Sequence, residues 1–571
     1  MKQIESYNWF ETILLVIEKN SRRFYITIIT CLIFHALTLF LILFFWLDSF
    51  DFQIIFTLIK GWVFSIFSPD KGVPFKLFNK IYHLNSVDVH KYITDLVIPH
   101  TQIRHKFILS VYSSFLSYLS APILFYFFLK KLKIKATKEY ITGSQLISSK
   151  EFNLQIMDKN RYLPFGKDIK LPVAYETKHL LLVGSTGSGK TVLLSRIINA
   201  AIKRKNNCVI YDYKGDYSSK FFNKKTDHLF NPLDDRCLKW NVFNDIENND
   251  DIEAFSASLI PPAIGSDSKF WNDAARDVLT GIIVYLHQNN KKTNKDIWET
   301  ITLDIKDIAE LLKKTPGAER GYAYIQYESS TQALNIVGRL IHYTKSFEYL
   351  QHIDGSFSIR KWLQDPKFNI FVSNHSNTKD YLKPILSAFV DLMGRHFISL
   401  KNDSYRRVFF FLDDFGTLQH LPSILNLQIF GTSKGASVWI GIQDLGQLEN
   451  IYGKDISSII TRACSNSVYL RVSDPITSQY LSDKIGKAVF SVSKERYSMG
   501  DLDNRHSSNL FKSEKTENLV KTSELMALKD LEGYVFFCGT NITKVKFPSD
   551  YHSASAIESM VDGMGGVLRA T

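Results

Sequence analysis

The stretch GSTGSGKT, Gly184 to Thr191, matches in full the P-loop pattern G-x-x-x-x-G-K-[ST]. It follows the apolar run HLLLVG and precedes VLLSRIINAAI, which reads as a helix. In this strand–loop–helix context the glycines let the backbone curl so that its N–H groups point inward. The helix N-terminus behind the loop adds partial positive charge. The sequence therefore predicts a loop that binds the phosphates of a nucleoside triphosphate.

The last two residues of this loop have separate predicted roles. Lys190 is predicted to reach the β- and γ-phosphates, and the Thr191 hydroxyl is predicted to ligate Mg²⁺. The rest of the loop supplies mainly backbone N–H groups to the nucleotide, from Gly184, Ser185, Thr186, Gly187, Ser188 and Gly189. Mg²⁺ is therefore an expected cofactor beside the nucleotide.

Short apolar runs after the loop alternate with helical stretches. Continuous apolar strands between helices indicate an α/β fold with a parallel sheet covered on both faces. The predicted strands are CVIYDY (208–213), NIFVSN (369–374), VFFFLDD (408–414), SVWIGIQD (437–444) and SVYLRV (467–472).

The run VFFFLDD has the form of a Walker B strand, in which apolar residues deliver a carboxylate to the sheet edge near the P-loop. Asp413 is predicted to hold the Mg²⁺ shell, and Asp414 occupies the position of a residue that orients or activates water. Gln443 ends the next strand and is a candidate sensor of the γ-phosphate, although an ordinary polar strand end explains it equally well. The predicted catalytic set is Lys190, Asp413, Asp414 and Gln443.

Two apolar segments precede the P-loop. Neither segment, 25–47 or 107–129, contains Asp, Glu, Lys or Arg. Each is long enough to cross a bilayer. Basic residues precede the first segment and follow the second, which places both ends in the cytoplasm. Residues 52–67 carry Lys60 and a predicted break at Lys60–Gly61, so we expect them to lie in the outward loop rather than to cross.

Composition agrees with a membrane-anchored chain that has a large cytosolic body. The formal net charge of +12 favours a polyanionic partner, either nucleic acid or lipid headgroups. The five cysteines lack metal-binding spacing and suit a reducing compartment. The polar stretch 494–517 is predicted to be a mobile loop.

Several further motifs, in a fixed order, make the chain resemble the type IV secretion coupling proteins of the TraD/TrwB group, which are hexameric inner-membrane ATPases. These motifs are the E-x-x-H element Glu176–His179, YDYKGD (211–216), FNPLDDRCLKWNVF (230–243), KFWNDAAR (269–276) and IYG (451–453). The resemblance covers nearly the whole chain. It implies that the nucleotide is ATP and that the chain is a P-loop ATPase.

The resemblance also implies an architecture, a RecA-like core interrupted by an all-α domain and preceded by a two-helix transmembrane region. Polar and basic side chains of the all-α domain and the core would meet DNA through its phosphates, without base readout. The expected parts are a cytoplasmic N-terminus (1–23), a transmembrane domain (24–130) with a periplasmic loop (48–106), the RecA-like domain (140–250 and 366–548), the all-α domain (251–365) and a tail (549–571).

Two departures from the family pattern bear on catalysis. Asp414 stands where relatives usually carry glutamate, which is one methylene longer. GTSKG (431–435) replaces the usual G-R-K-x-G, so Thr432 cannot supply the arginine that reaches a neighbouring subunit's γ-phosphate. Lys434 or Lys178 is a candidate replacement, although two solvated surface lysines are an equally good interpretation.

The resemblance implies a multi-pass inner-membrane coupling ATPase, forming a homohexamer with its large domain in the cytoplasm. It would recruit and pump single-stranded DNA with an attached relaxase to a type IV secretion channel, without DNA sequence preference. The expected partners are relaxosome proteins and channel components. Two alternatives remain, a receptor that docks protein effectors for the channel and a double-stranded DNA translocase of the FtsK/HerA type.

Overall fold

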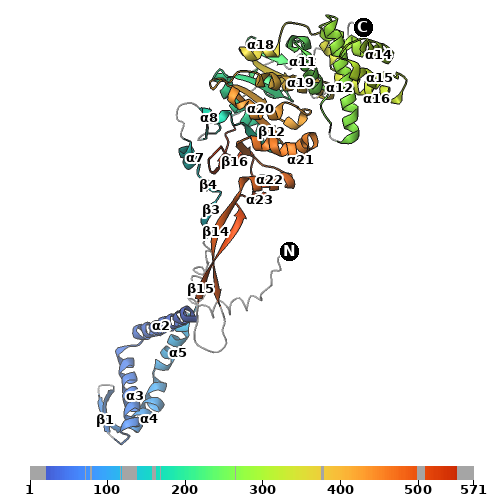
Figure 1. Cartoon of the computed structure of the whole chain (residues 1–571). Helices are drawn as coiled ribbons and strands as arrows, with labels where there is room; N and C mark the ends of the chain where they lie inside the picture. Colours follow the sequence, from blue (N-terminus) through green and yellow to red (C-terminus); the bar gives the residue numbers. More distant parts are fainter. Residues whose placement is uncertain are drawn as a thin grey trace. The chain divides into compact units, whose positions relative to one another are not determined.

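The computed structural model describes residues 21–549 except 71, 78–79, 116–117, 119–137, 157–161, 167–168, 264, 375–378 and 498–507. The chain divides into two compact units, Met1–Ala136 and Thr137–Thr571 (Figure 1). The elements of each unit are described separately below.

The first unit contains two long apolar helices, α2 (Ser21–Trp46) and α3 (Ser49–Phe67). Within the described residues, these are the two helices long and apolar enough to cross a membrane, over Ile28–Trp46 and Ser49–Phe67. The first agrees with the predicted span 25–47. The predicted span 107–129 lies mostly outside the described residues, and its described beginning belongs to helix α5 (Ile103–Ser114).

The predicted break at Lys60–Gly61 is wrong, because α3 continues through both residues. Gly61 is instead a close-packing position: a Cβ added there would lie 3.0 Å from Val89 Cγ1 of helix α4 (Ser86–Tyr92). The hairpin of β1 (Gly72–Leu77) and β2 (Lys80–Asn85) completes this part. A small apolar core joins these elements, formed by Ile54, Phe75, Val89, Ile93, Val97 and Ile103.

A ten-stranded sheet forms the centre of the second unit, in the order β4-β17-β16-β13-β7-β12-β11-β8-β10-β9. All five predicted strands are confirmed, as β8 (Asn207–Asp212), β10 (Asn369–Ser373), β11 (Val408–Leu412), β12 (Ala436–Ile442) and β13 (Asn466–Tyr469). They run parallel to the P-loop strand β7 (Leu180–Val183) and to β9 (Asp227–Phe230). The sheet is nevertheless mixed, because β16 (Glu532–Phe536) pairs antiparallel with both β13 and β17 (Ile542–Lys546). The short strand β4 (Leu146–Ile147) completes it beside β17.

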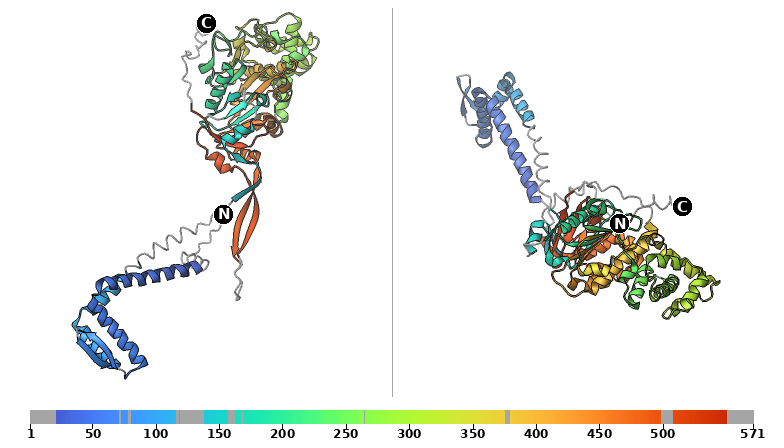
Figure 2. Two further views of the ribbon diagram at one scale, coloured as in Figure 1. Left: turned by 90° about the vertical axis from the view of Figure 1, so that its left-hand side faces the viewer. Right: turned by 90° about the horizontal axis from the view of Figure 1, so that it is seen from above.

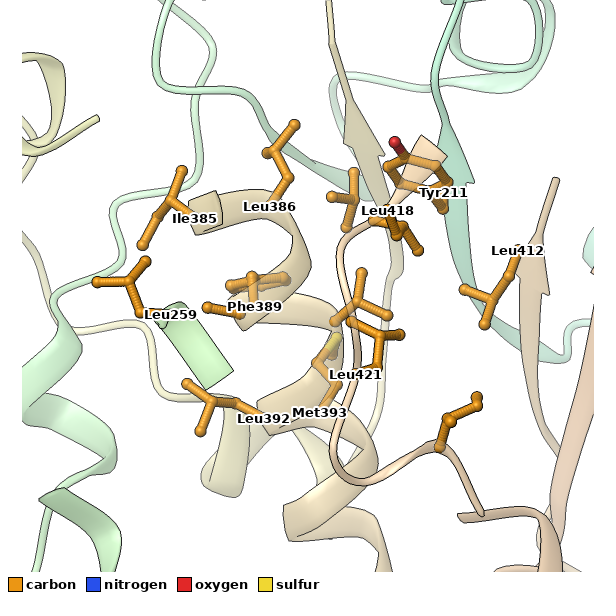
Figure 3. Close-up of a cluster of buried hydrophobic side chains, with 14 of the residues drawn as sticks. Tyr211, Leu259, Ile385, Leu386, Phe389, Leu392, Met393, Leu412, Leu418 and Leu421 are labelled. Carbon is orange, nitrogen blue, oxygen red and sulfur yellow. The ribbon is translucent and has the colours of Figure 1, made fainter. Parts of the chain in front are cut away.

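Both faces of this sheet are covered, as its apolar strands predict. Successive side chains of β11 alternate between two cores: Phe410 packs with helix α19 (Lys379–Ile398), and Phe409 packs on the side of α9 (Lys190–Lys203). Figure 3 shows the α19 side, where Phe389 and Met393 lie beside Leu412 and other apolar residues. This double burial fixes the register of β11 and so the position of the acidic pair that follows it.

A group of helices separates β9 from β10 in the sequence and gathers at one end of the sheet (Figure 2). They are α11 (Asn249–Leu259), α12 (Ser266–Gln288), α13 (Asn294–Ile301), α14 (Ile305–Lys313), α15 (Glu319–Ile325), α16 (Thr331–Thr344), α17 (Phe347–Leu350) and α18 (Ile359–Gln364). A RecA-like sheet with an all-α insertion is therefore the fold of this unit, as predicted.

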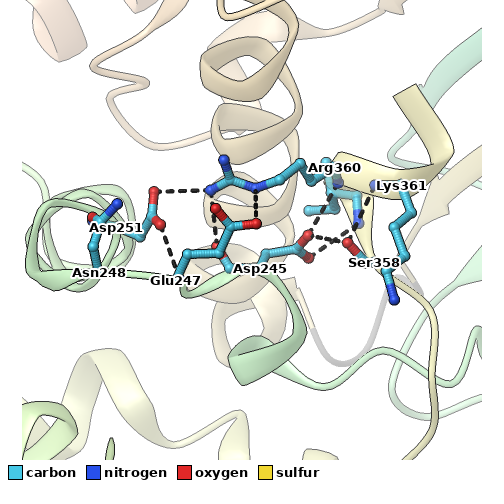
Figure 4. A network of polar contacts seen from close by, with 8 residues as sticks. Asp245, Glu247, Asn248, Asp251, Ser358, Arg360 and Lys361 are labelled. Atoms are coloured by element: carbon cyan, nitrogen blue, oxygen red, sulfur yellow. Dashed lines mark hydrogen bonds and ion pairs between the residues drawn. The ribbon is translucent and has the colours of Figure 1, made fainter. Parts of the chain in front are cut away.

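The buried carboxylate of Asp245 links the segment that enters the helical insertion to the segment that leaves it. Asp245 accepts hydrogen bonds from the Ser358 hydroxyl at 2.6 Å and from the Ile359 N–H at 3.0 Å. Arg360, next to them, is 3.0 Å from Asp251 at the start of α11 (Figure 4). The two ends of the helical insertion are thus bound to each other.

The predicted mobile loop 494–517 is wrong for residues 494–497 and 508–517, which form strands, and residues 498–507 lie outside the described part of the chain. Strands β14 (Lys487–Tyr497) and β15 (Ser508–Asn518) pair antiparallel along their whole length, and β3 (Lys138–Gly143) pairs with β14. This ribbon extends from the body of the second unit (Figure 1). Its polar sequence resembles that of a loop, so the strands were not predicted.

The E-x-x-H element has a structural place at the amino-terminal edge of the sheet. Buried Glu176 pairs with Arg204 at 2.7 Å. His179 Nε2 lies 2.7 Å from the Gln428 carbonyl oxygen, and His179 Nδ1 accepts from the Val438 N–H at 3.0 Å. Because Nδ1 accepts, the neutral imidazole with the proton on Nε2 fits both contacts.

Burial of His179 should make the free energy of unfolding depend on pH. Burial lowers the pKa of His179 from its ordinary value of 6.5 to about 4, so near pH 5 the unfolded chain binds a proton that the folded chain does not. Its contribution is complete above the unfolded pKa and is lost as the pH falls toward the folded one. The free energy of unfolding should therefore fall by about 2 kcal/mol from this group between about pH 7.5 and pH 5.

Urea unfolding at the two pH values measures this change. His179→Gln should remove this part of the pH dependence, whereas replacement of the exposed His342 by Gln should keep it. An unaltered pH dependence in His179→Gln would contradict the assignment.

Candidate nucleotide site

The P-loop joins the carboxyl end of β7 to the start of α9. Gly187 and Gly189 have φ values of +77° and +107°, which glycine adopts without steric cost. The Gly184 N–H donates to the Ile442 carbonyl at 3.1 Å, which ties the loop to β12. A Cβ at Gly189 would overlap the Leu531 side chain. The loop is thus held in a tight curl at the sheet edge where the predicted acidic pair also lies.

Three donors surround the Asp414 carboxylate. Lys190 Nζ lies 3.1 Å from Asp414 Oδ1, and Lys214 Nζ lies 3.2 Å from Oδ2. The Gln443 amide donates to Oδ1 at 3.0 Å, while its carbonyl accepts from the Thr186 hydroxyl at 3.2 Å. Four residues predicted from sequence, Lys190, Asp414, Gln443 and Thr186, therefore lie in one contact network.

Asp413 lies beside this network, with a separate set of partners. Its Oδ1 accepts from the Asp414 N–H at 2.9 Å, and its Oδ2 accepts from the Tyr217 hydroxyl at 2.5 Å. Burial raises the pKa of the Tyr217 phenol, and the nearby Thr191 side chain partly offsets this effect. The two predicted Mg²⁺ ligands, Asp413 and Thr191, thus share one phenol as a neighbour.

The electrostatics of the two acids differ. Burial raises the pKa of Asp413, and the charge of Asp414 raises it further. Burial would also raise the pKa of Asp414, but the charges of Lys190 and Lys214 and the Gln443 hydrogen bond hold it below its usual value. Asp414 is therefore a carboxylate matched by two ammonium groups.

The sequence analysis missed Lys214 and Tyr217 as members of this site. Both lie on the turn that follows β8, the neighbour of β11 in the sheet. Lys214 belongs to the YDYKGD motif and Tyr217 directly follows it, so the motif indicates where this turn lies in the sequence. Only the strand order places its side chains against Asp413 and Asp414.

The candidate trans-acting residues lie elsewhere. Lys178 precedes β7 and lies 3.5 Å from the Cys538 sulfur. Lys434 precedes β12 and donates to the Leu400 carbonyl at 2.6 Å. Thr432 donates to the Gln428 carbonyl at 3.1 Å. All three lie at the amino ends of their strands, opposite the P-loop of the same chain, so a catalytic role for either lysine remains a prediction that requires a neighbouring subunit.

The residues fit a nucleotide with Mg²⁺. The first N–H groups of α9 have no partner within the helix, and the helix begins with the buried ammonium of Lys190. Mg²⁺ bound with a nucleotide needs only one or two protein oxygens beside phosphate and water, which Thr191 and Asp413 provide.

Most of the second unit matches one family of known proteins. Residues 166–548 match the family model of the type IV secretion-system coupling protein DNA-binding domain. The coupling protein TraD of Escherichia coli (strain K12) is 26% identical over 424 residues, which are 71% of this chain and 58% of TraD. The chain thus spans less than two thirds of the length of that relative.

Solved structures of the plasmid coupling protein TrwB share the fold. The unbound monoclinic form of TrwBdeltaN70 has a TM-score of 0.65 at 26% identity, covering 73% of this chain and 96% of that one. TrwB in complex with the ATP analogue ADPNP also has a TM-score of 0.65, at 25% identity, covering 74% and 98%. With the family model matched over most of the chain, this protein belongs to the family of type IV secretion-system coupling proteins.

Proposed function

We propose that this chain is a membrane-anchored coupling ATPase that recruits single-stranded DNA with its relaxase and moves it to a type IV secretion channel. The observation that carries the proposal is the cluster of Lys190, Asp414 and Gln443 beside the P-loop. The TrwB structures support it, because that relative is solved with ADPNP and with ADP and Mg²⁺.

Each residue of the cluster has a proposed role in hydrolysis. Bound ATP with Mg²⁺ supplies the phosphoanhydride to be cleaved and part of the neutralising charge. Lys190 and the loop N–H groups bind the phosphates, and Thr191 and Asp413 hold the Mg²⁺. Asp414 orients the attacking water, and Gln443 senses the γ-phosphate.

The contacts of Asp414 suggest how these roles are coupled. Lys190 cannot contact phosphate oxygens fully while it is paired with Asp414 Oδ1 at 3.1 Å. When Lys190 turns to the phosphates, Oδ1 retains Gln443 and Oδ2 retains Lys214. Release of Lys190 thus frees a lone pair of Asp414 Oδ1 for a water molecule. Phosphate binding and activation of the base are proposed to be linked in this way.

The remaining parts follow the family. Residues 140–250 and 366–548 are proposed to form the motor, and the helices within 251–365 are proposed to face DNA. Contacts to phosphates are expected to be independent of base sequence. Assembly as a hexamer in the inner membrane, anchored through the apolar N-terminal helices, would bring Lys178 or Lys434 toward the site of a neighbour.

Binding of fluorescent single-stranded oligonucleotides to the full chain tests the choice of cargo. The proposal expects two unrelated sequences to bind within about threefold of each other, with affinity falling linearly in log–log plots against salt. A strong preference for duplex DNA would favour a double-stranded DNA translocase. Absence of DNA binding at low salt would favour a receptor for protein effectors.

A further inference from the structure

The phenol of Tyr217 contacts one of the two residues proposed to hold Mg²⁺. Its hydroxyl donates to Asp413 Oδ2 at 2.5 Å, and the Thr191 side chain is close enough to influence the pKa of the phenol. Tyr217 is 196 residues from Asp413 in the sequence. No role in nucleotide chemistry follows for it from the P-loop or Walker B patterns.

The backbone around Tyr217 is firmly anchored. Asp212, the last residue of β8, is fully buried and accepts at one oxygen, Oδ2, from the Tyr217 N–H at 3.0 Å. The same oxygen accepts from the Ser218 N–H and the Ser218 hydroxyl, both at 2.7 Å. Gly215, with φ of +79°, lets the chain turn tightly between these residues. The turn is therefore closed onto the end of its own strand.

The ring itself is also fixed. Tyr217 is only 2% exposed and belongs to the apolar cluster on the α9 side of the sheet, together with Leu194, Phe371 and Phe411. Moving the phenol away from Asp413 would require this packing to open. The hydroxyl is therefore a permanent neighbour of Asp413 rather than a mobile group that a bound ion displaces.

We infer that Tyr217 is a positioning residue of the Mg²⁺ site, which orients the Asp413 carboxylate. The inference rests on the proposed function. Asp413 Oδ1 is fixed by the Asp414 N–H and Oδ2 by the phenol. A carboxylate offers about four lone-pair positions, so lone pairs remain for the metal or its water after both bonds. By its hydrogen bond, Tyr217 thus determines which lone pairs of the Asp413 carboxylate face the ion.

Removal of such an outer hydrogen bond typically lowers metal affinity by about 10–100-fold. Tyr217→Phe removes only the hydroxyl and retains the ring that fills the core. We expect the Mg²⁺ concentration that half-saturates Mg²⁺-dependent ADP binding to rise by about tenfold or more. ADP binding in EDTA, which depends on the P-loop without the metal, should change less than about twofold, because the phenol donates to Asp413, whose proposed role is to hold the metal.

Tyr211→Phe is the matched control. Tyr211 lies at the end of the same strand, is equally buried at 2% exposure, and pairs through its hydroxyl with Thr417 at 3.0 Å. The Tyr211→Phe variant therefore lacks a buried hydroxyl of the same kind, but one whose partner is Thr417 rather than Asp413. Its Mg²⁺ half-saturation should equal that of the unaltered chain.

The experiment measures ADP binding by the full chain in detergent, by calorimetry, across Mg²⁺ concentrations and in EDTA. A double-mutant cycle adds a second readout: in an Asp413→Asn background, Tyr217→Phe should cause no further rise, since Tyr217 acts through Asp413. Retained ADP binding in EDTA shows that each variant is folded.

Three results would overturn the inference while leaving the proposed function intact. These are an unchanged Mg²⁺ half-saturation in Tyr217→Phe, a lowered one that would mean the phenol competes with the ion, or an equal rise in Tyr211→Phe. If the unaltered chain bound no ADP at any Mg²⁺ concentration, the proposed function itself would fail, and this inference with it.

Discussion

Replacement of Lys190 by alanine is expected to lower ATP hydrolysis by about 10²–10³-fold, the usual cost of removing a donor aimed at developing transition-state charge. The Lys190 ammonium is buried at the start of α9, where helix and loop N–H groups converge. Its loss also leaves Asp414 Oδ1 with Gln443 alone. The steady-state rate at saturating single-stranded DNA measures the effect.

Lys203→Ala provides the matched control for this prediction. Lys203 lies on the same helix but is exposed in its last turn, so its removal should leave the rate within about twofold. Residual hydrolysis above one tenth of the normal rate in Lys190→Ala would contradict the role given to the P-loop lysine.

Asp414→Asn should separate binding from hydrolysis. Asn keeps the shape of the side chain and tolerates the left-handed backbone of this position, where φ is +47°. The change removes the charge that pairs with Lys190 and Lys214. We expect hydrolysis to fall by about 10²–10⁴-fold, the range attributed to a positioned acid or base. ATP affinity should be unchanged or higher, because Lys190 is no longer held by a carboxylate.

Asp414→Glu is the companion variant that keeps the charge and lengthens the side chain by one methylene. It should retain hydrolysis within about tenfold of the normal rate, since a carboxylate remains near the water position. Equilibrium binding of a non-hydrolysable ATP analogue and steady-state hydrolysis together test both variants. Normal hydrolysis by Asp414→Asn would show that another group serves as the base.

The core of the site was predictable from sequence because its residues follow directly from buried strands. VFFFL is apolar on both faces, so its end had to emerge at the sheet edge, and the P-loop fixes the same edge for β7. Gln443 follows β12 by the same logic, and its amide donates to Asp414 in the structure. No equivalent rule predicts what a turn residue such as Lys214 contacts.

Two kinds of feature were not predictable from the sequence: contacts that depend on the order of strands in the sheet, and strands made of polar residues. Tyr217 reaches Asp413 because β8 lies beside β11, although the two residues are 196 positions apart in the sequence. The antiparallel strand β16 was not predicted, nor was the ribbon of β14 and β15, whose polar residues resemble a loop. Continuity of α3 through Gly61 depended on its contact with Val89, which is equally invisible in sequence.

The most direct test of the account is steady-state ATP hydrolysis by the fragment Thr137–Thr571, with and without single-stranded DNA, across a range of protein concentrations. The account predicts hydrolysis that depends on Lys190, is stimulated by DNA, and loses that stimulation as salt rises. A robust Lys190-dependent rate that DNA leaves unchanged at every protein concentration would contradict a DNA motor and favour a receptor for protein substrates.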